Sequence, residues 1–265
     1  MILRHIPIDN KGRQTLVACA SVATWWTGPS QRRLFSSVMI HYRNYQRWIN
    51  GVASPRSKSQ PLKYVRSLQH YCLTPVTETS YWMRNLHNLR SLGLSYIEIG
   101  HINKAEYHPC FSAFRETLTN LTLEDFDTSF SAFVTLVDYF PNITTLQLGS
   151  FEVKSDEGVV PPLSRPLRGK LCLHANRVGF FDQLAGLDPE YEELVLGSRF
   201  STGEKFVGLP QLCANTVKYL RLTVGFKREH PYETSSSLHI LTQFLTFQPE
   251  QQRRSATFDN CESWK

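Results

Sequence analysis

Histidine and cysteine side chains lie close together at two places in the sequence. His70 precedes Cys72, and a second group contains His101, His108 and Cys110. Such side chains bind zinc when they are spaced as pairs, for example C-x-x-C or H-x-x-x-H. Neither group has a zinc-ligand spacing. We therefore expect loop histidines and buried thiols here, and no metal site.

Motifs of the common enzyme classes are missing from the sequence. It contains no G-x-S-x-G, H-E-x-x-H or C-x-x-C, and Gly-Glu-Lys at 203–205 lacks the spacing of a phosphate-binding loop. Asp125 and Asp127, or Asp156 and Glu157, have the residue types of a general acid and base. Their places after a strand or in a Pro/Gly loop favour solvated carboxylates instead. We expect no enzyme activity, no cofactor and no small-molecule substrate.

A recurring L-x-x-L-x-L pattern predicts the elements that carry the other polar side chains. Its central apolar residue returns every 23 to 29 residues between positions 34 and 247, a spacing typical of leucine-rich repeats. The last two apolar residues of each unit point to one face of a strand, and parallel strands need long crossovers. The pattern predicts an α/β leucine-rich-repeat solenoid of about eight degenerate repeats. The central residues are Val38, Val65, Leu92, Leu121, Leu146, Leu171, Leu194 and Leu220.

Helices are expected in some of the crossovers. The clearest covers 130–140, where apolar residues follow a 3.6-residue period, Thr128 or Ser129 can cap the start, and Pro141 ends it. Residues 248–265 follow the last repeat and are expected to form a C-terminal tail. Shorter helices are predicted at 111–117, 180–187 and 238–247.

Residues 1–33 do not follow the repeat and predict a helical segment. A helix is expected from Arg13 to Trp26. The segment resembles the later part of an F-box, in which I-L-x-x-L-P precedes a helix ending in V-C-x-x-W; Val22 and Trp26 match that ending. The L-P-x-E opening of the family is absent ahead of Met1, which we interpret as a shortened gene model or isoform. The start of the pattern is matched by Ile2, Leu3, Ile6 and Pro7.

The full chain resembles the F-box/leucine-rich-repeat proteins that are abundant in mushroom-forming fungi. In that group the F-box continues directly into the first repeat, as it does here at Leu34-Phe35-Ser36-Ser37-Val38. The resemblance implies the substrate-recognition subunit of an SCF-type cullin–RING ubiquitin ligase, which binds a Skp-family adaptor and a target protein. A stand-alone repeat scaffold without ligase association is the alternative, because the F-box is incomplete. The adaptor-binding residues that the resemblance implies are Ile6, Pro7, Leu16, Val22 and Trp26.

Target binding is expected on the strand residues that point away from the leucines. Solenoid proteins use the concave face of the sheet for binding, and Tyr and Arg often serve as anchors in interfaces. The target protein itself is not identified by the pattern. The candidates on this face are Arg66, Lys170, His174, Tyr219 and Arg221.

Charge and cysteine usage narrow the partners and the compartment. The chain has 29 Lys and Arg against 23 Asp and Glu in 265 residues, and no basic run exceeds two residues. We expect no nucleic-acid partner from so mild an excess. The six cysteines are scattered, which favours a reducing compartment. Residues 11–23 imitate a signal peptide, but a short buried helix is the preferred interpretation. Apolar runs are too short for a membrane span, so we expect a cytoplasmic or nuclear protein without a membrane partner.

Overall fold

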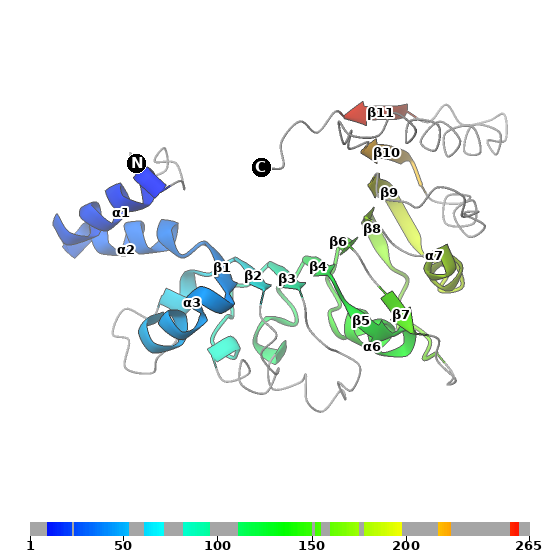
Figure 1. Cartoon of the computed structure of the whole chain (residues 1–265), viewed down its shortest axis with the longest axis horizontal. Helices are drawn as coiled ribbons and strands as arrows, with labels where there is room; N and C mark the ends of the chain where they lie inside the picture. Colours follow the sequence, from blue (N-terminus) through cyan, green and yellow to red (C-terminus); the bar gives the residue numbers. More distant parts are fainter. Residues whose placement is uncertain are drawn as a thin grey trace. The chain divides into compact units, whose positions relative to one another are not determined.

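The computed structural model is a mixed α/β structure in which parallel strands alternate with helices and irregular segments (Figure 1). The chain divides into two compact units. Unit 1 contains Met1–Ile97, Ile102–Thr119 and Phe140–Asn142, and unit 2 contains Glu98–His101, Asn120–Tyr139 and Ile143–Lys265. The structure describes residues 10–22, 24–52, 61–71, 82–95, 111–149, 152–154, 160–174, 178–197, 217–223 and 255–259.

Unit 1 begins with helices and continues into a parallel sheet with the strand order β1-β2-β3. Its described elements are α1 (Asn10–Val22), α2 (Thr24–Leu34), β1 (Ser37–His41), α3 (Tyr42–Arg47), the π-helical turn η2 (Trp48–Val52), the 3-10 turn η3 (Pro61–Tyr64), β2 (Ser67–Tyr71), β3 (Ser91–Ser95) and the 3-10 turn η4 (Ser112–Phe114).

Unit 2 has a parallel sheet with the order β4-β6-β8-β9-β10-β11 and a separate parallel pair, β5 and β7. Its described elements are β4 (Asn120–Glu124), β5 (Asp127–Ser129), α6 (Phe130–Tyr139), β6 (Thr145–Gly149), β7 (Glu152–Lys154), β8 (Arg168–His174), α7 (Val178–Ala185), β9 (Glu190–Gly197), β10 (Tyr219–Thr223) and β11 (Ser255–Asp259).

The helix predicted from Arg13 to Trp26 is divided between two helices, so the prediction of a single helix was wrong. Helix α1 ends at Val22, and α2 begins at Thr24 and continues to Leu34, past the predicted end at Trp26. The hydroxyl of Thr27 donates a 3.0 Å hydrogen bond to the carbonyl of Ala20. This bond satisfies one of the last carbonyls of α1, which have no partner within their own helix.

Strands occur at the predicted positions in unit 1, but the predicted frame of the second repeat was wrong. Val38, Leu68 and Leu92 are aligned in register, so Leu68 rather than Val65 is the central residue. Val65 is buried just before β2 and is the first residue of its triplet. The third residue is His70, a polar side chain that the apolar pattern does not accept.

The leucine positions of unit 2 are confirmed. Leu121, Leu146, Leu171 and Leu194 follow one another in register, and all four are buried. Strand β11 lies within 248–265, where the sequence predicted only a tail, and it pairs in parallel with β10.

The predicted helices of unit 2 are also found. Helix α6 covers Phe130–Tyr139, and the hydroxyl of Ser129 accepts a 3.2 Å hydrogen bond from the amide of Ala132 at its start. Helix α7 accounts for the prediction at 180–187, and the ring of Phe180 packs against those of Phe130 and Phe133. In unit 1 the prediction at 111–117 is a 3-10 turn, and 238–247 lies outside the described residues. No described helix combines the length and apolarity needed to span a membrane.

His70 is the one histidine in the leucine positions of the described sheet. It is aligned between Ile40 and Leu94, is 1% exposed, and lies against the rings of Tyr45 and Trp82. In the described part of the chain neither ring nitrogen has a hydrogen-bond partner. Burial disfavours the charged imidazolium and lowers the pKa of His70 to about 4.

Replacing His70 tests this core position. From the ordinary pKa of 6.5 down to about 4, the unfolded chain binds a proton that the folded chain excludes. The free energy of unfolding therefore falls as the pH falls through this window, by about 3 kcal/mol in total. We expect His70→Leu to lose this part of the pH dependence and to be more stable than the parent at acidic pH.

Urea unfolding at about pH 7 and about pH 5 measures the difference. His87, an exposed histidine of the same unit, provides the control variant His87→Gln, which should retain the parent's pH dependence. An unchanged dependence in His70→Leu would contradict the assigned role.

Candidate functional site

Four of the predicted target-binding residues come together on one face of β8, β9 and β10 in unit 2. This face, here called the outer face, points away from the buried leucines because side chains alternate along a strand. Lys170, Glu193 and Tyr219 are aligned across the three strands. The next outer row contains Cys172, Val195 and Arg221, and His174 follows Cys172 on β8 by two residues.

A partly buried ion pair lies in the first outer row. The Lys170 Nζ donates to the Glu193 Oε1 at 2.9 Å, and the two side chains retain about a third of their exposure or less, 31% and 28%. Partial burial reduces solvent screening, so this pair is held more firmly than an exposed one. Beside it, Tyr219 is 56% exposed and presents an aromatic ring with a hydroxyl group to the solvent.

The second outer row is largely buried, although it lies on the face opposite the leucines. Cys172 and Val195 are 7% and 6% exposed. Burial raises the pKa of the Cys172 thiol, the nearby Glu193 raises it further, and Lys170 and Arg221 oppose the shift. A thiol with a raised pKa is protonated at neutral pH and is a poor nucleophile. The row is therefore suited to packing rather than covalent chemistry.

His174 occupies a space that the absence of a side chain at Gly197 leaves open. It is aligned with Gly149 of β6, and a Cβ atom at Gly197 of β9 would overlap its imidazole ring. A Cβ at Gly149 would lie 3.4 Å from the Cγ of Glu124, at ordinary contact distance. The signal in the sequence is a glycine directly after the leucine pair of β6 and of β9.

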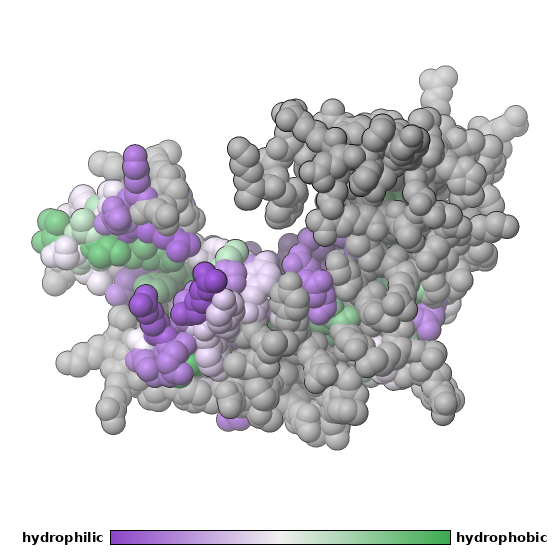
Figure 2. Space-filling model, viewed as in Figure 1, coloured by the Kyte–Doolittle hydropathy of each residue, from purple (hydrophilic) through white to green (hydrophobic). Residues whose placement is uncertain are grey.

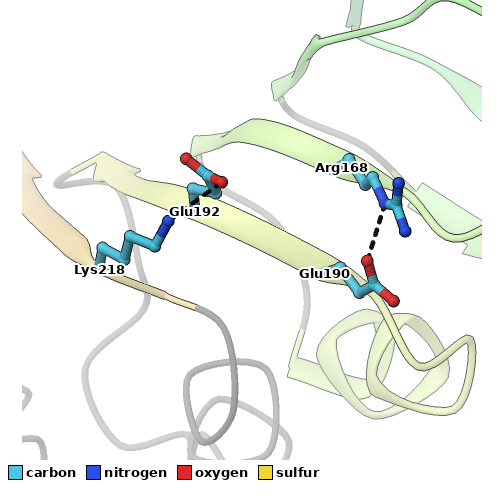
Figure 3. Close-up of polar contacts among 4 residues, drawn as sticks. All are labelled: Arg168, Glu190, Glu192 and Lys218. Carbon is cyan, nitrogen blue, oxygen red and sulfur yellow. Dashed lines mark hydrogen bonds and ion pairs between the residues drawn. The ribbon is translucent and has the colours of Figure 1, made fainter.

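Exposed ion pairs border the outer face where β8, β9 and β10 begin. Arg168 donates to Glu190 at 2.8 Å, and Lys218 donates to Glu192 at 3.2 Å; both contacts are drawn in Figure 3. Together with the Lys170 pair, each carboxylate of β9 therefore has a cationic partner on a neighbouring segment. Pairs this exposed contribute little stability, so they serve as controls for changes of charge.

A register shift at Gly169 places Lys170 opposite Glu193. Gly169 has a positive φ of 87°, and an added Cβ would overlap the carbonyl oxygen of Thr144. Only glycine adopts this conformation here without strain.

Arg66 does not join the other predicted target-binding residues. It lies directly before β2 in unit 1 rather than on the outer face of that strand. The misplaced frame of the second repeat caused this error. The outer residues of β2 are Ser67, Gln69 and Tyr71, which alternate with the buried Leu68 and His70.

The predicted adaptor-binding residues fall into three groups. Leu16 is fully buried in α1, which assigns it to the core of the unit. Val22 is 77% exposed at the end of α1, and Trp26 is half-buried in α2 beside Trp25, which is 73% exposed. Ile6 and Pro7 lie outside the described residues.

The side chains considered for catalysis or metal binding do not form a site in the described ranges. No group of three His, Cys, Asp or Glu residues there is arranged to hold a metal ion. Asp125 is exposed after β4 with a positive φ of 49°. Apart from His70, the other candidates are not among the residues whose side chains the structure describes. They are Cys72, His101, His108, Cys110, Asp127, Asp156, Glu157 and 203–205.

Comparison with known proteins adds no assignment to this geometry. No family model matches the chain, and no curated protein matches it.

Substitution of Gly169 tests the positioning of the outer face. We expect Gly169→Ala to lower the free energy of unfolding by about 2 kcal/mol, because alanine is strained at this φ and overlaps Thr144. Urea unfolding measures the loss. Gly28→Ala in α2 is the matched control, because no atom lies within 4 Å of its added Cβ; a helical alanine should stabilise by up to about 1 kcal/mol. Equal stability of Gly169→Ala and the parent would contradict the expected strain.

Proposed function

We propose that the protein is a leucine-rich-repeat interaction protein that binds a target protein on the outer face of β8–β10. The observation that carries the proposal is the arrangement of Lys170, His174, Tyr219 and Arg221 on one sheet face, on the two strands β8 and β10 that flank β9. We further propose that it acts as the substrate-recognition subunit of an SCF-type ubiquitin ligase, as its resemblance to F-box/leucine-rich-repeat proteins implies.

The strand arrangement supports the repeat interpretation. Parallel strands follow one another in sequence order in each unit, and leucine-type residues are aligned along their buried face. Each crossover brings the chain back to begin the next parallel strand, as a solenoid requires. Within unit 2 the outer rows are therefore composed of one side chain from each successive strand.

The chemistry of the outer face favours a protein partner. Tyr219 supplies exposed aromatic area, and Arg221 is half-buried, so part of its rotamer freedom is already lost before binding. Tyr and Arg with these properties are frequent energetic anchors of interfaces. The Lys170–Glu193 pair offers charges of both signs, which favours a partner with a complementary polar pattern.

An exposed apolar surface on the α1–α2 hairpin supports the adaptor-binding part of the proposal. Val17, Val22 and Trp25 are large hydrophobic side chains that the hairpin leaves exposed. Figure 2 shows hydrophobic side chains over this part of unit 1. Ubiquitin transfer itself occurs on other subunits of such a ligase, so the proposed role is to raise the local concentration of the target.

Target capture is tested by removing three anchors together. We expect Lys170→Ala with His174→Ala and Arg221→Ala to reduce the recovery of specific partners by about tenfold or more. Proximity labelling in the native host with quantitative mass spectrometry measures recovery, and circular dichroism checks the fold. The control replaces the exposed pair Arg168 and Glu190 with alanine, which should preserve the partner set. Unchanged recovery in the triple variant would reject the outer face as the binding surface.

Adaptor binding is tested by co-purification with a Skp-family adaptor. We expect stable association at micromolar concentration, and at least about tenfold weaker association for Val22→Asp, which places a charge on an exposed apolar surface. Met39→Asp, at another exposed hydrophobic residue, is the control and should bind like the parent. Failure of the parent to associate would favour the stand-alone scaffold and leave target binding on β8–β10 open to its own test.

A further inference from the structure

Charge is distributed very unevenly between the two units. Residues 1–97 contain thirteen Lys and Arg but only two acids, Asp9 and Glu78. Residues 98–265 contain sixteen Lys and Arg and twenty-one acids. The net charge of +6 for the chain therefore combines about +11 in the first segment with about −5 in the second. Such asymmetry indicates an anionic partner for the basic part.

Nearly all of the described basic residues in this segment are exposed. None of the exposed ones has a carboxylate oxygen within 4.0 Å among the residues that the structure describes; in unit 1 the ion pair found there joins Arg115 and Glu116. The β9 carboxylates of unit 2, by contrast, each have a cationic partner. The exposed residues are Lys11, Arg13, Arg32, Arg43, Arg47, Lys63, Arg66, Arg84 and Arg90.

The backbone places Arg66 and Arg90 at equivalent points of neighbouring repeats. The amide of Arg66 donates to the carbonyl of Ser36 at 2.9 Å, and the amide of Arg90 donates to the carbonyl of Arg66 at 2.8 Å. The amide of Thr119 continues this series at the carbonyl of Arg90. Two exposed guanidinium groups therefore leave adjacent backbone segments. Like charges in this arrangement repel each other unless an anion lies between them.

A row of serines lies directly beside these arginines. Ser37, Ser67 and Ser91 are aligned in register at the start of β1, β2 and β3, and each of the two arginines immediately precedes one of them. Because side chains alternate along a strand, these serines lie on the outer face, which Arg66 and Arg90 do not join. We call Arg66 and Arg90 the basic edge. Guanidinium groups are hydrogen-bond donors to anionic oxygens, and their repetition from one strand to the next suits successive carboxylates of a partner segment.

The aromatic side chains described in and beside the strands of unit 1 favour a protein segment over a nucleic acid. Tyr42 is 71% exposed, but the guanidinium of Arg43 lies 5.4 Å from its ring centre. The ring of Tyr71 is stacked on His41, and Lys63 lies over Tyr64. Binding of single-stranded nucleic acid uses aromatic faces on which bases stack. These rings already have a partner on one face. Figure 2 shows strongly hydrophilic side chains over α3 in this unit.

We propose that the basic edge of unit 1 binds an acidic, Asp- and Glu-rich segment of a partner protein. Carboxylates of the partner would balance the net positive charge of residues 1–97, and complementary charge would also accelerate the encounter. This surface differs from the outer face of β8–β10. Binding there is therefore expected to survive the triple substitution of Lys170, His174 and Arg221.

Fluorescence anisotropy on the full chain tests the proposal with a labelled peptide of alternating Glu and Asp. We expect binding that weakens as salt is added, because exposed charges are screened. Arg66→Glu with Arg90→Glu should weaken binding by about tenfold or more, whereas Arg66→Lys with Arg90→Lys should retain most of it. Arg168→Glu with Lys218→Glu makes the same change of net charge in unit 2 and should bind like the parent.

Three results would overturn the proposal. The first is the absence of peptide binding at low salt, or equal binding of a Gln and Asn peptide. The second is equal loss in the unit 1 and unit 2 charge variants, which would indicate attraction to net charge alone. The third is tighter binding of a single-stranded RNA with the same number of charges, which would assign the basic edge to nucleic acid. If Arg66→Glu with Arg90→Glu fails to fold, Arg66→Gln alone provides the comparison.

Discussion

A parallel strand has to bury its leucines and pair its backbone with neighbouring strands, and this requirement organises the molecule. Leu146 of β6 illustrates it, because Leu121 and Leu171 lie beside it in register and all three are buried. Register on the leucine face also aligns the opposite face, since side chains alternate along a strand. The outer rows of β8–β10 and the serine row of unit 1 are consequences of this alignment.

The repeat pattern and helix α6 were predictable because both depend on local periodicity. The errors arose where a single residue departs from that periodicity. His70 replaces a leucine, so the frame of the second repeat moved by three residues and Arg66 was assigned to the wrong face. The register shift at Gly169 requires knowledge of the neighbouring strand, because its cause is the close approach to Thr144. Strand β11 contains no leucine triplet, so the repeat pattern did not predict it.

The candidate sites depend even more on pairing between strands. Alternation was sufficient to place Lys170 and Tyr219 on one face, but the burial of Cys172 depends on neighbours that are distant in sequence. For a related reason, the net charge of the whole chain does not reveal the charge of each unit. A total over the whole chain treats the paired carboxylates of β9 as if they neutralised Arg66 and Arg90. Charges act over about 10 Å at physiological salt, so a balance within each unit is the relevant quantity.

Asparagine side chains in unit 1 form hydrogen bonds between successive repeats. Asn88 donates to the carbonyl of Lys63 at 2.8 Å, and Asn142 donates to the carbonyl of Glu116 at 2.7 Å. Each asparagine precedes the first apolar residue of its triplet, and each bonds to the preceding repeat. Thr117 makes an equivalent link to the carbonyl of Leu89. Because different side chains act as the donor to these carbonyls, the position of the donor can vary while the leucine pattern persists. Degenerate repeats of this kind are therefore recognised more reliably by their buried strand residues than by a fixed polar position.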